Sequence, residues 1–306
     1  MPIRSLQHVC LAVPDATVGR TFYDAFGLEA REGGKSMAFR CAGRDQDQIV
    51  LVEGPKKRLH HLCFGTTAAE LPQIQKTLEG NGVKLLNPPN EMGPEANGLW
   101  FHDPDGLLVN VKVADRKPSR TDTPWIVNTP GHYGRLNARG APGRDLPVKP
   151  RRLGHTIVFT PNVDRKLDFY IKNLGMRLSD RSGDIIAFMH TAPPSDHHVL
   201  ALLKDTKTGF HHASFEVGSV DEIEIGAQRL LDKGYHNGWG FGRHVLGSNF
   251  FHYIRDPWNS LAEYFCDIDV IPEGATWDAR DWPAEDSLYL WGPPTPEDFG
   301  RNYEAD

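Results

Sequence analysis

The feature that most constrains the fold is an internal repeat, because motifs of the first half of the chain return in the second half about 150 residues later. Three motif pairs carry the repeat: LQH (6–8) and LGH (153–155), LHHLCF (59–64) and FHHASF (210–215), and HDPDGLLVN (102–110) and RDPWNSLAE (255–263). Their order is kept, and the spacing drifts only slightly, as small loop insertions would produce. Strand-like runs and helical patterns alternate in each half, so we predict an α+β protein built from tandem βαβββ units, two per half.

The repeat divides the chain into two domains, a linker and a tail. We expect the first domain to span residues 1–114 and the second to span residues 151–267. Residues 115–150 are rich in Pro, Gly and Arg and have little periodicity, which is typical of a linker lying along the surface. Residues 268–306 are rich in Trp and Pro. We expect this tail to pack on a domain or a neighbouring subunit, in preference to roofing a pocket.

Composition and charge argue against several classes of partner. The chain of 306 residues carries 34 Lys and Arg against 40 Asp and Glu, a net charge of −6, whereas proteins that bind nucleic acids usually carry a basic patch. No apolar run approaches the roughly 20 residues needed to span a membrane, and the N-terminus does not resemble a signal peptide. The four cysteines show no CxxC spacing, so we interpret them as buried free thiols in a reducing cytoplasm. We therefore expect a cytoplasmic protein with no nucleic-acid or membrane partner.

Histidines and a carboxylate lie on strand-like segments of the second half. His155 is in LGHTIVF, His211 and His212 are in FHHASFEV, and Glu263 follows a DP turn. Two imidazoles and a carboxylate on three strands are the ligand set of the facial triad that holds non-heme Fe(II) and leaves coordination positions open. Because side chains alternate faces along a strand, only one of the adjacent histidines is expected to face the metal. Asn110 stands in the first half where the second has the glutamate, so we predict one metal site, in the second half.

The segment from residue 242 to 265, GRHVLGSNFFHYIRDPWNSLAEYF, joins a histidine, a tyrosine, a DP turn and a glutamate in that order. This order resembles the signature of the type I extradiol catechol dioxygenases, which belong to the vicinal-oxygen-chelate superfamily. The resemblance covers roughly residues 1–267 and is most specific in 153–267. Two residues depart from the family pattern: His252 replaces an aliphatic or aromatic residue, and Asn259 replaces a common turn glycine. Neither change removes a ligand, and asparagine tolerates the left-handed conformation of a turn.

The resemblance implies a fold, a ligand set and a metal. Each domain would be a half-open mixed barrel. The metal ligands would be His155, His212 and Glu263, and His211 would lie on the opposite face of its strand, in packing or behind the ligands. The metal would be Fe(II), with Mn(II) as the alternative that the same ligands suit.

The resemblance also implies roles for four further residues. An acid–base histidine is expected in SDHHVLALL, where we favour His197 over His198, since an imidazole can take and return a proton near neutral pH. His244 and Tyr253 fall where the family has groups that hydrogen-bond the bound substrate.

The implied reaction inserts both atoms of O2 into a catechol-type vicinal aromatic diol and opens the ring beside the two oxygens, giving a muconic semialdehyde-type product. The implied assembly is a homo-oligomer, a dimer or a tetramer. Trp239, Leu246, Phe250 and the tail aromatics are expected to form an apolar pocket rim. Such a rim would favour a plain, alkyl-bearing or aryl-bearing catechol over a carboxylate-bearing one.

Two other functions remain open alternatives. A lyase or isomerase of the same superfamily would use four protein ligands or a different set, and only three are evident here. A non-catalytic protein that binds an aromatic ligand would lack the triad that this chain carries.

Overall fold

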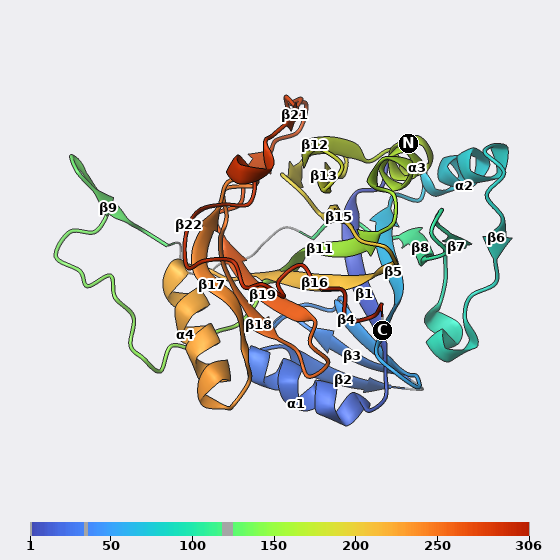
Figure 1. Ribbon diagram of the computed structural model, residues 1–306. Coiled ribbons are helices and arrows are strands. Elements are labelled where there is room, and N and C mark those ends of the chain that lie inside the picture. Colours follow the sequence, from blue (N-terminus) through green and yellow to red (C-terminus); the bar gives the residue numbers. More distant parts are fainter. Residues whose placement is uncertain (1, 34–35, 118–124, 306) are drawn as a thin grey trace.

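The computed structural model describes residues 2–33, 36–117 and 125–305, and each half of the chain forms one large mixed sheet (Figure 1). The elements of the first half are β1 (Ser5–Val13), α1 (Ala16–Phe26), β2 (Glu29–Gly33), β3 (Ser36–Arg40), β4 (Ile49–Glu53), β5 (Arg58–Thr66), α2 (Leu71–Gly80), β6 (Leu85–Leu86), the 3-10 helix η1 (Asn90–Glu95), β7 (Leu99–His102) and β8 (Leu108–Val113). The strands are ordered β2-β3-β4-β1-β5-β8-β7-β6. The two βαβββ units therefore join through the antiparallel pair β1 and β5.

The second half repeats this plan. Its elements are β11 (Arg152–Thr160), α3 (Val163–Leu174), β12 (Arg177–Ser182), β13 (Ile186–His190), β15 (Leu200–Lys204), β16 (Gly209–Glu216), α4 (Val220–Asp232), β17 (Asn237–His244), β18 (Phe250–Arg255) and β19 (Leu261–Cys266). The order β12-β13-β15-β11-β16-β19-β18-β17 matches that of the first half, with β11 and β16 at the junction. The prediction of tandem βαβββ units is confirmed.

Corresponding helices begin and end through the same local chemistry. The side chain of Asp15 caps α1 by accepting a hydrogen bond from the backbone of Thr17, and Asn162 caps α3 in the same way. Gly27 and Gly175 end these helices with φ of 97° and 65°, a left-handed conformation that glycine adopts without steric cost. The repeat therefore extends to the residues that set the helix ends.

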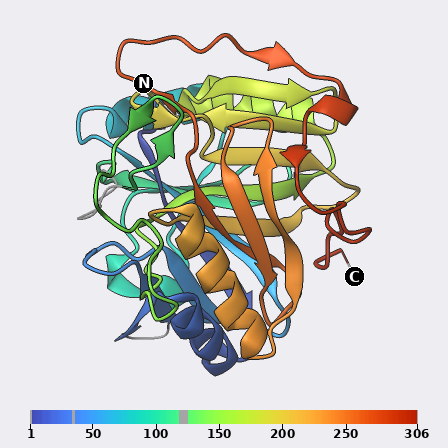
Figure 2. The same ribbon diagram turned by 90° about the vertical axis from the view of Figure 1, so that its left-hand side faces the viewer.

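The two halves share a hydrophobic core. Helix α1 packs beside α4, as Figures 1 and 2 both show, and α2 contacts α3. The ring of Phe26 stacks on Tyr264 at 4.0 Å, and the Tyr264 hydroxyl donates to the Phe26 carbonyl at 2.6 Å. At the other end of the interface the buried Lys166 lies 2.9 Å from Asp103. These contacts hold the second sheet against a rigid partner.

The described part of the linker is mostly irregular. It contains a short ribbon of β9 (Asn128–Thr129) and β10 (His132–Tyr133) that projects from the body (Figure 1, green), and residues 118–124 lie outside the described residues. Within the residues that the structure covers, no helix is long and apolar enough to cross a membrane.

The tail returns across the second sheet. Its elements are β20 (Val270–Ile271), β21 (Arg280–Asp281), the 3-10 helix η2 (Ala284–Asp286) and β22 (Tyr289–Trp291), and β20 pairs with the short β14 (Ser195–Asp196). Strand β21 joins the edge strand β12, and β22 joins the opposite edge strand β17. The few residues between β21 and β22 can span at most roughly 30 Å. The second sheet is therefore curved enough to bring its two edges close together, and the tail bridges them.

Candidate metal centre and active site

Three adjacent strands of the second sheet bring His155, His212 and Glu263 together. His155 Nε2 lies 3.1 Å from Glu263 Oε2, and His212 Nε2 lies 3.3 Å from the same oxygen. All three residues are buried. The three ligand atoms lie within 4.8 Å of one another, close enough to hold one metal ion.

The strand register explains this convergence. His155 on β11 pairs with Ser214, two residues beyond His212 on β16, and Ser214 pairs with Glu263 on β19. Residues two apart on a strand share a face. The three ligands therefore point to the same side of the sheet from consecutive strands, and a rigid ladder sets their separation.

His211 lies on the same face as His212, so the expectation that it lies on the opposite face is wrong. The pairing of β11 with β16 shifts between Ile157 and Val158, and His211 has no partner at this bulge. A bulge interrupts the alternation of side chains and re-aims one of them. As a result His211 Nδ1 lies 2.7 Å from His212 Nδ1, and His211 lines the same cavity as the ligands.

The protonation states of Glu263 and His212 suit a divalent cation. Burial disfavours the charged form of Glu263, but the two facing imidazoles outweigh it and hold the pKa of this carboxyl below its usual value. Asn249 Nδ2 donates to Glu263 Oε1 at 3.2 Å and further stabilises the anion. Burial lowers the pKa of His212, and its Nε2 is a buried nitrogen without a hydrogen bond. An ionised carboxylate and neutral imidazoles are the forms that bind metal, so the residues fit the predicted ion.

His198, and not the favoured His197, lies at the cavity. The His198 ring is 4.3 Å from that of His155, and His198 lines the cavity. His197 is directed away from it: its Nε2 is 2.8 Å from Asp180 Oδ2 and its Nδ1 is 3.0 Å from His198 Nδ1. The geometry therefore favours His198 over His197, because neighbouring residues of this segment face different sides, and the acid–base role itself stays a prediction. Burial, with the nearby His155, lowers the pKa of His198 well below its ordinary value.

His244 and Tyr253 lie together at the cavity wall. The Tyr253 hydroxyl is 2.8 Å from His244 Nε2, and His244 Nδ1 donates to the carbonyl of Leu288 in the tail at 2.7 Å. This second contact leaves Nε2 of a neutral His244 as the acceptor for the tyrosine. Burial lowers the pKa of His244 to about 4, and burial, with the nearby Glu263, raises the pKa of Tyr253 well above its ordinary value. Both groups are therefore neutral near pH 7.

The cavity in front of the triad has a volume of about 360 Å³ and is largely apolar. Its apolar lining includes Ile157, Ile185, Ile186, Phe188, Leu203, Leu246, Leu288 and Phe299. The last two come from the tail, which thus roofs the cavity in addition to packing on the sheet. The Phe299 carbonyl lies 2.8 Å from His211 Nε2, and this contact joins the tail over the cavity to strand β16.

Of the residues expected at the pocket rim, only part reaches the cavity. Leu246 lines it, but Trp239 and Phe250 are not among the described lining residues. Trp239 is buried against Phe251, and Phe250 stacks on Phe241. These two expectations are wrong for different reasons. Phe250 is an odd number of positions from Tyr253 on β18 and therefore faces the other side of the sheet. Trp239 pairs with Tyr253 and shares its face, but it packs against Phe251 and Phe299 beside the cavity.

Comparison with known proteins agrees with this geometry. The family model described as the Glyoxalase/Bleomycin resistance protein/Dioxygenase superfamily matches residues 5–111 and 152–264, once in each half. The chain belongs to this superfamily. It is 45% identical over 304 residues to metapyrocatechase 2 of Cupriavidus necator, covering 99% of this chain and 93% of that protein.

Two further similarities are more distant. An iron-dependent extradiol dioxygenase of Rhodococcus jostii (strain RHA1) is 26% identical over 95% of this chain and 97% of its own length. The crystal structure of the Mn(II)-bound glyoxalase from Novosphingobium aromaticivorans covers 100% of this chain and 99% of its own, with a TM-score of 0.75 and 23% identity. The structural likeness shows that the fold is the one this superfamily uses.

The two departures from the dioxygenase signature lie outside the metal centre. The imidazole of His252 lies 2.6 Å from Glu224 and 2.9 Å from Asn237, on the outer side of the hairpin. Asn259 adopts φ of 68° at the turn, which confirms that asparagine takes the left-handed position.

Several residues of the centre were not foreseen from the sequence. Asn249 hydrogen-bonds the ligand Glu263, and Asp180 accepts from His197 and from the indoles of Trp277 and Trp282. Asn249 stands in the GSNFF segment before β18, where a polar residue directly before two phenylalanines was a usable signal. Asp180 gave no such signal, because its partners come from distant strands.

Proposed function

We propose that this protein is an extradiol dioxygenase that inserts both atoms of O2 into a catechol and opens the ring beside its two oxygens. The observation that carries the proposal is the buried His155–His212–Glu263 group facing an apolar cavity of about 360 Å³. The identity of 45% with metapyrocatechase 2 along nearly the whole chain supports it.

The metal that we propose for this centre is Fe(II), held by His155, His212 and Glu263. Two imidazoles and a carboxylate with open positions are the donor set of non-heme Fe(II) oxygenases, and a relative named as iron-dependent supports the choice. The same donors suit Mn(II), the ion named for the similarly folded glyoxalase. When bound, such an ion supplies a template for the diol and O2 and the electrons that activate O2.

We propose that His198 is the group that moves a proton. Asp180 accepts the Nε2–H of His197, which leaves His197 Nδ1 as an acceptor for the Nδ1–H of a neutral His198. His198 Nε2 then carries the lone pair that can take a proton from a substrate oxygen in the cavity and later return it. His197 and Asp180 would act as positioning residues, since they fix the tautomer of His198.

His244 and Tyr253 are proposed to orient the substrate. The Tyr253 hydroxyl donates to His244 Nε2 and can accept from a substrate hydroxyl through its remaining lone pair. Both side chains line the cavity beside the ligands. Their hydrogen bonds would hold one diol oxygen in a fixed direction, which brings the reacting atoms together.

The proposed substrate is a catechol that is plain or carries an alkyl or aryl group. The cavity wall is mainly aliphatic and aromatic, and Glu297 of the tail also lines it. A substrate carboxylate there would be desolvated beside an acidic side chain. Comparison of kcat/KM for a methylcatechol and a carboxymethyl catechol tests this point, and preference for the acid would contradict it.

The test of the reaction is O2 consumption with a panel of catechols, on protein loaded anaerobically with Fe(II), while the visible spectrum is recorded. We expect one O2 consumed per catechol and a yellow product. Absence of uptake across the panel, with bound metal verified by elemental analysis, would contradict ring cleavage and favour a lyase or isomerase of the superfamily.

We also propose that the protein forms a homo-oligomer. The linker exposes large apolar side chains near its projecting ribbon, among them Ile126, Tyr133 and Leu136. Clustered exposed apolar residues are typical of association surfaces. Sedimentation velocity of the wild type and of Leu136→Asp tests the proposal, which fails if the wild type sediments as a monomer at micromolar concentration.

A further inference from the structure

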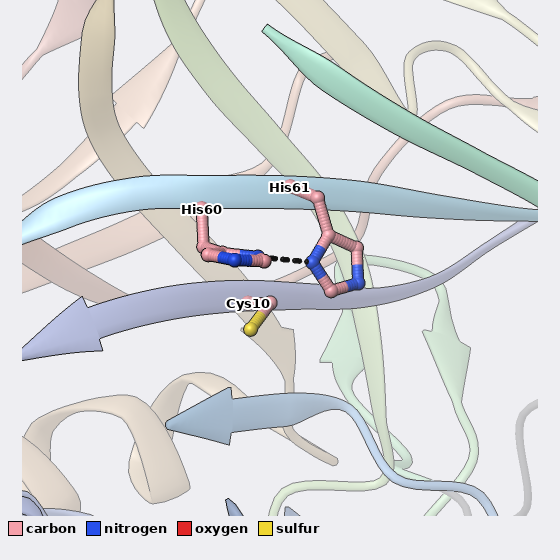
Figure 3. Close-up of side chains that lie close together, drawn as sticks. All are labelled: Cys10, His60 and His61. Atoms are coloured by element: carbon pink, nitrogen blue, oxygen red, sulfur yellow. Dashed lines mark hydrogen bonds between the residues drawn. The ribbon is translucent and has the colours of Figure 1, made fainter. Parts of the chain in front are cut away.

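The first half contains a second group of side chains with metal-binding atoms: Cys10 on β1, and His60 and His61 on β5 (Figure 3). One ligand atom from each lies within 4.8 Å of the others, the same limit that the triad of the second half meets. Cys10 and His61 are fully buried, and His60 is only partly exposed. Figure 3 shows the rings of His60 and His61 side by side, with the Cys10 side chain next to them.

A β-bulge brings these residues to one face. The pairing of β1 with β5 shifts between Cys10 and Leu11, and His60 has no partner there, just as His211 has none in the second half. His60 Nδ1 and His61 Nδ1 consequently lie 2.7 Å apart. At the position of Cys10 the second half has Ile157, because each pairs with the second histidine of its doublet. The substitution of a thiol for an aliphatic side chain is what creates a donor set in the first half.

The outward ring nitrogens of both histidines have partners that suit ligands. His60 Nε2 lies 3.0 Å from Glu91 Oε1, and His61 Nε2 lies 2.9 Å from His8 Nε2. Histidines that bind metals usually donate the N–H of their other ring nitrogen to a carboxylate or another acceptor. If both Nε2 atoms donate, both Nδ1 atoms present lone pairs to the same small space. A cation between them satisfies both lone pairs at once.

We propose that Cys10, His60 and His61 form a second metal site, which binds a thiolate-preferring divalent cation of the zinc type. One thiolate and two imidazoles match such an ion, whereas the carboxylate-containing triad suits Fe(II) or Mn(II). On binding, the Cys10 S–H bond breaks, the proton passes to solvent, and a sulfur–metal bond forms. Three protein ligands leave one position for water.

The surroundings of the site agree with this assignment. His60 also lines a cavity of about 760 Å³ at the junction of the two halves, so one member of the group lies at an opening. Burial raises the pKa of the Cys10 thiol well above its ordinary value, so the metal-free site holds a neutral thiol. Binding therefore releases a proton, and the affinity for the cation rises with pH.

Cobalt substitution tests the proposal on the full-length protein. Only a thiolate ligand gives Co(II) a sulfur-to-metal charge-transfer band in the near ultraviolet, and the His–His–Glu centre has no sulfur. We expect the wild type to bind two Co(II) per chain and Cys10→Ser to bind one. Cys10→Ser should lose the charge-transfer band, and its Fe(II)-loaded form should keep catechol-dependent O2 uptake. Glu263→Ala should also bind one Co(II), but it should keep the band and lose O2 uptake. The two sites, and the two proposals, thus fail independently.

Cys63→Ser is the matched control, since Cys63 lies on the neighbouring strand β5, is equally buried and donates to Asn110. It should keep the charge-transfer band. A band that is absent in the wild type, or that persists in Cys10→Ser, would overturn the proposal. If Cys10→Ser does not fold, His60→Gln provides the second test at a partly exposed residue, and it should weaken Co(II) binding at this site at least tenfold. Unchanged affinity in His60→Gln would equally overturn it.

Discussion

The two halves of the molecule use the same strands in the same order but place different side chains around the corresponding centre. His8 and His61 of the first half correspond to His155 and His212 of the second. The Nε2 atoms of His8 and His61 lie 2.9 Å apart. Three further positions differ. The register of the two sheets matches Asn110 with Glu263, Trp100 with Tyr253, and Asp47 with His198.

The replacements in the first half are all satisfied by the protein itself. Asn110 donates to the carbonyls of Asn97 and Leu99 and accepts from the thiol of Cys63. Asp47 is held by hydrogen bonds from Arg31 and Arg40. By contrast, His198 and Tyr253 line the cavity of the second half, and His212 Nε2 makes no hydrogen bond. A centre that binds ligands needs polar groups that the fold leaves available, and this difference separates the replaced positions of the first half from their counterparts in the second.

The surrounding cavities differ in the same sense. The cavity of the first half is about 660 Å³ and carries charged side chains such as Arg40, Asp47 and Lys112. The cavity of the second half is about 360 Å³ and largely apolar. A low-polarity enclosure strengthens the few electrostatic contacts that remain inside it. The second half is therefore better suited to hold an aromatic diol against a metal.

The largest effect is expected from exchanging the ligand carboxylate. Glu263→Gln should reduce O2 uptake to background and remove the tightly bound metal of this centre, because a neutral amide replaces the anionic donor. Asn110→Ala, at the corresponding position of the first half, should leave kcat within about twofold, since Asn110 contacts no residue of the active cavity. Elemental analysis and O2 electrode measurements on both variants check this. Equal losses in the two variants would break the distinction between the halves.

The acid–base assignment gives the next largest effect. His198→Gln should lower kcat by about 100-fold or more, the usual contribution of a general acid–base group. His197→Gln should cost less, about tenfold, because it removes only the group that orients His198. The pH profile of kcat separates the roles: His197→Gln should shift it, whereas His198→Gln should flatten it. A larger loss in His197→Gln would restore the original preference for that residue.

A third prediction concerns the contribution of the Asn110 amide to the free energy of unfolding. Asn110→Asp places a carboxylate against the carbonyls of Asn97 and Leu99, both of which now accept hydrogen bonds from the amide. Losing these bonds in a buried place should lower the free energy of unfolding by about 1–3 kcal/mol. Urea denaturation at neutral pH measures this. The exposed Asn128→Asp serves as the control, and equal destabilisation in both variants would contradict the argument.

The sequence alone was sufficient for the parts of this structure that depend on local pattern. The repeat predicted the tandem units, and the DP turn predicted a hairpin that carries Glu263, because turn residues and alternation are read within a few positions. The direction of His211 could not be predicted, since the bulge beside it depends on the pairing with β11. The choice between His197 and His198 likewise depends on Asp180, which lies on another strand. The tail's place over the cavity was not predictable because an aromatic, proline-rich segment can pack on any apolar surface.

The smallest effect is on the pH dependence of stability, to which buried groups of both halves contribute. His190 is the last residue of β13 in the second half. Burial lowers its pKa to about 4. Between pH 6.5 and 4 the unfolded chain therefore binds a proton at His190 that the folded chain does not. The free energy of unfolding consequently falls as the pH falls through this window, by at most about 1.4 kcal/mol per pH unit. Burial opposes ionisation of Asp47, but its bonds to Arg31 and Arg40 lower its pKa below 3.8. Its contribution is present above pH 3.8 and is lost only below it.

Urea denaturation of the protein after removal of metal with a chelator, repeated from neutral pH to below pH 3.8, checks the two pH windows. His190→Gln should flatten the dependence of the free energy of unfolding on pH in the upper window and leave the lower one unchanged, while Asp47→Asn should do the reverse. The exposed His132→Gln provides the control, because it removes a histidine from the projecting β9–β10 ribbon, away from the buried groups. If His190→Gln left the upper window as steep as in the wild type, His190 would not contribute to the acid sensitivity of the protein. The metal ligands would then remain as the groups to examine, by repeating the titration with the ion bound.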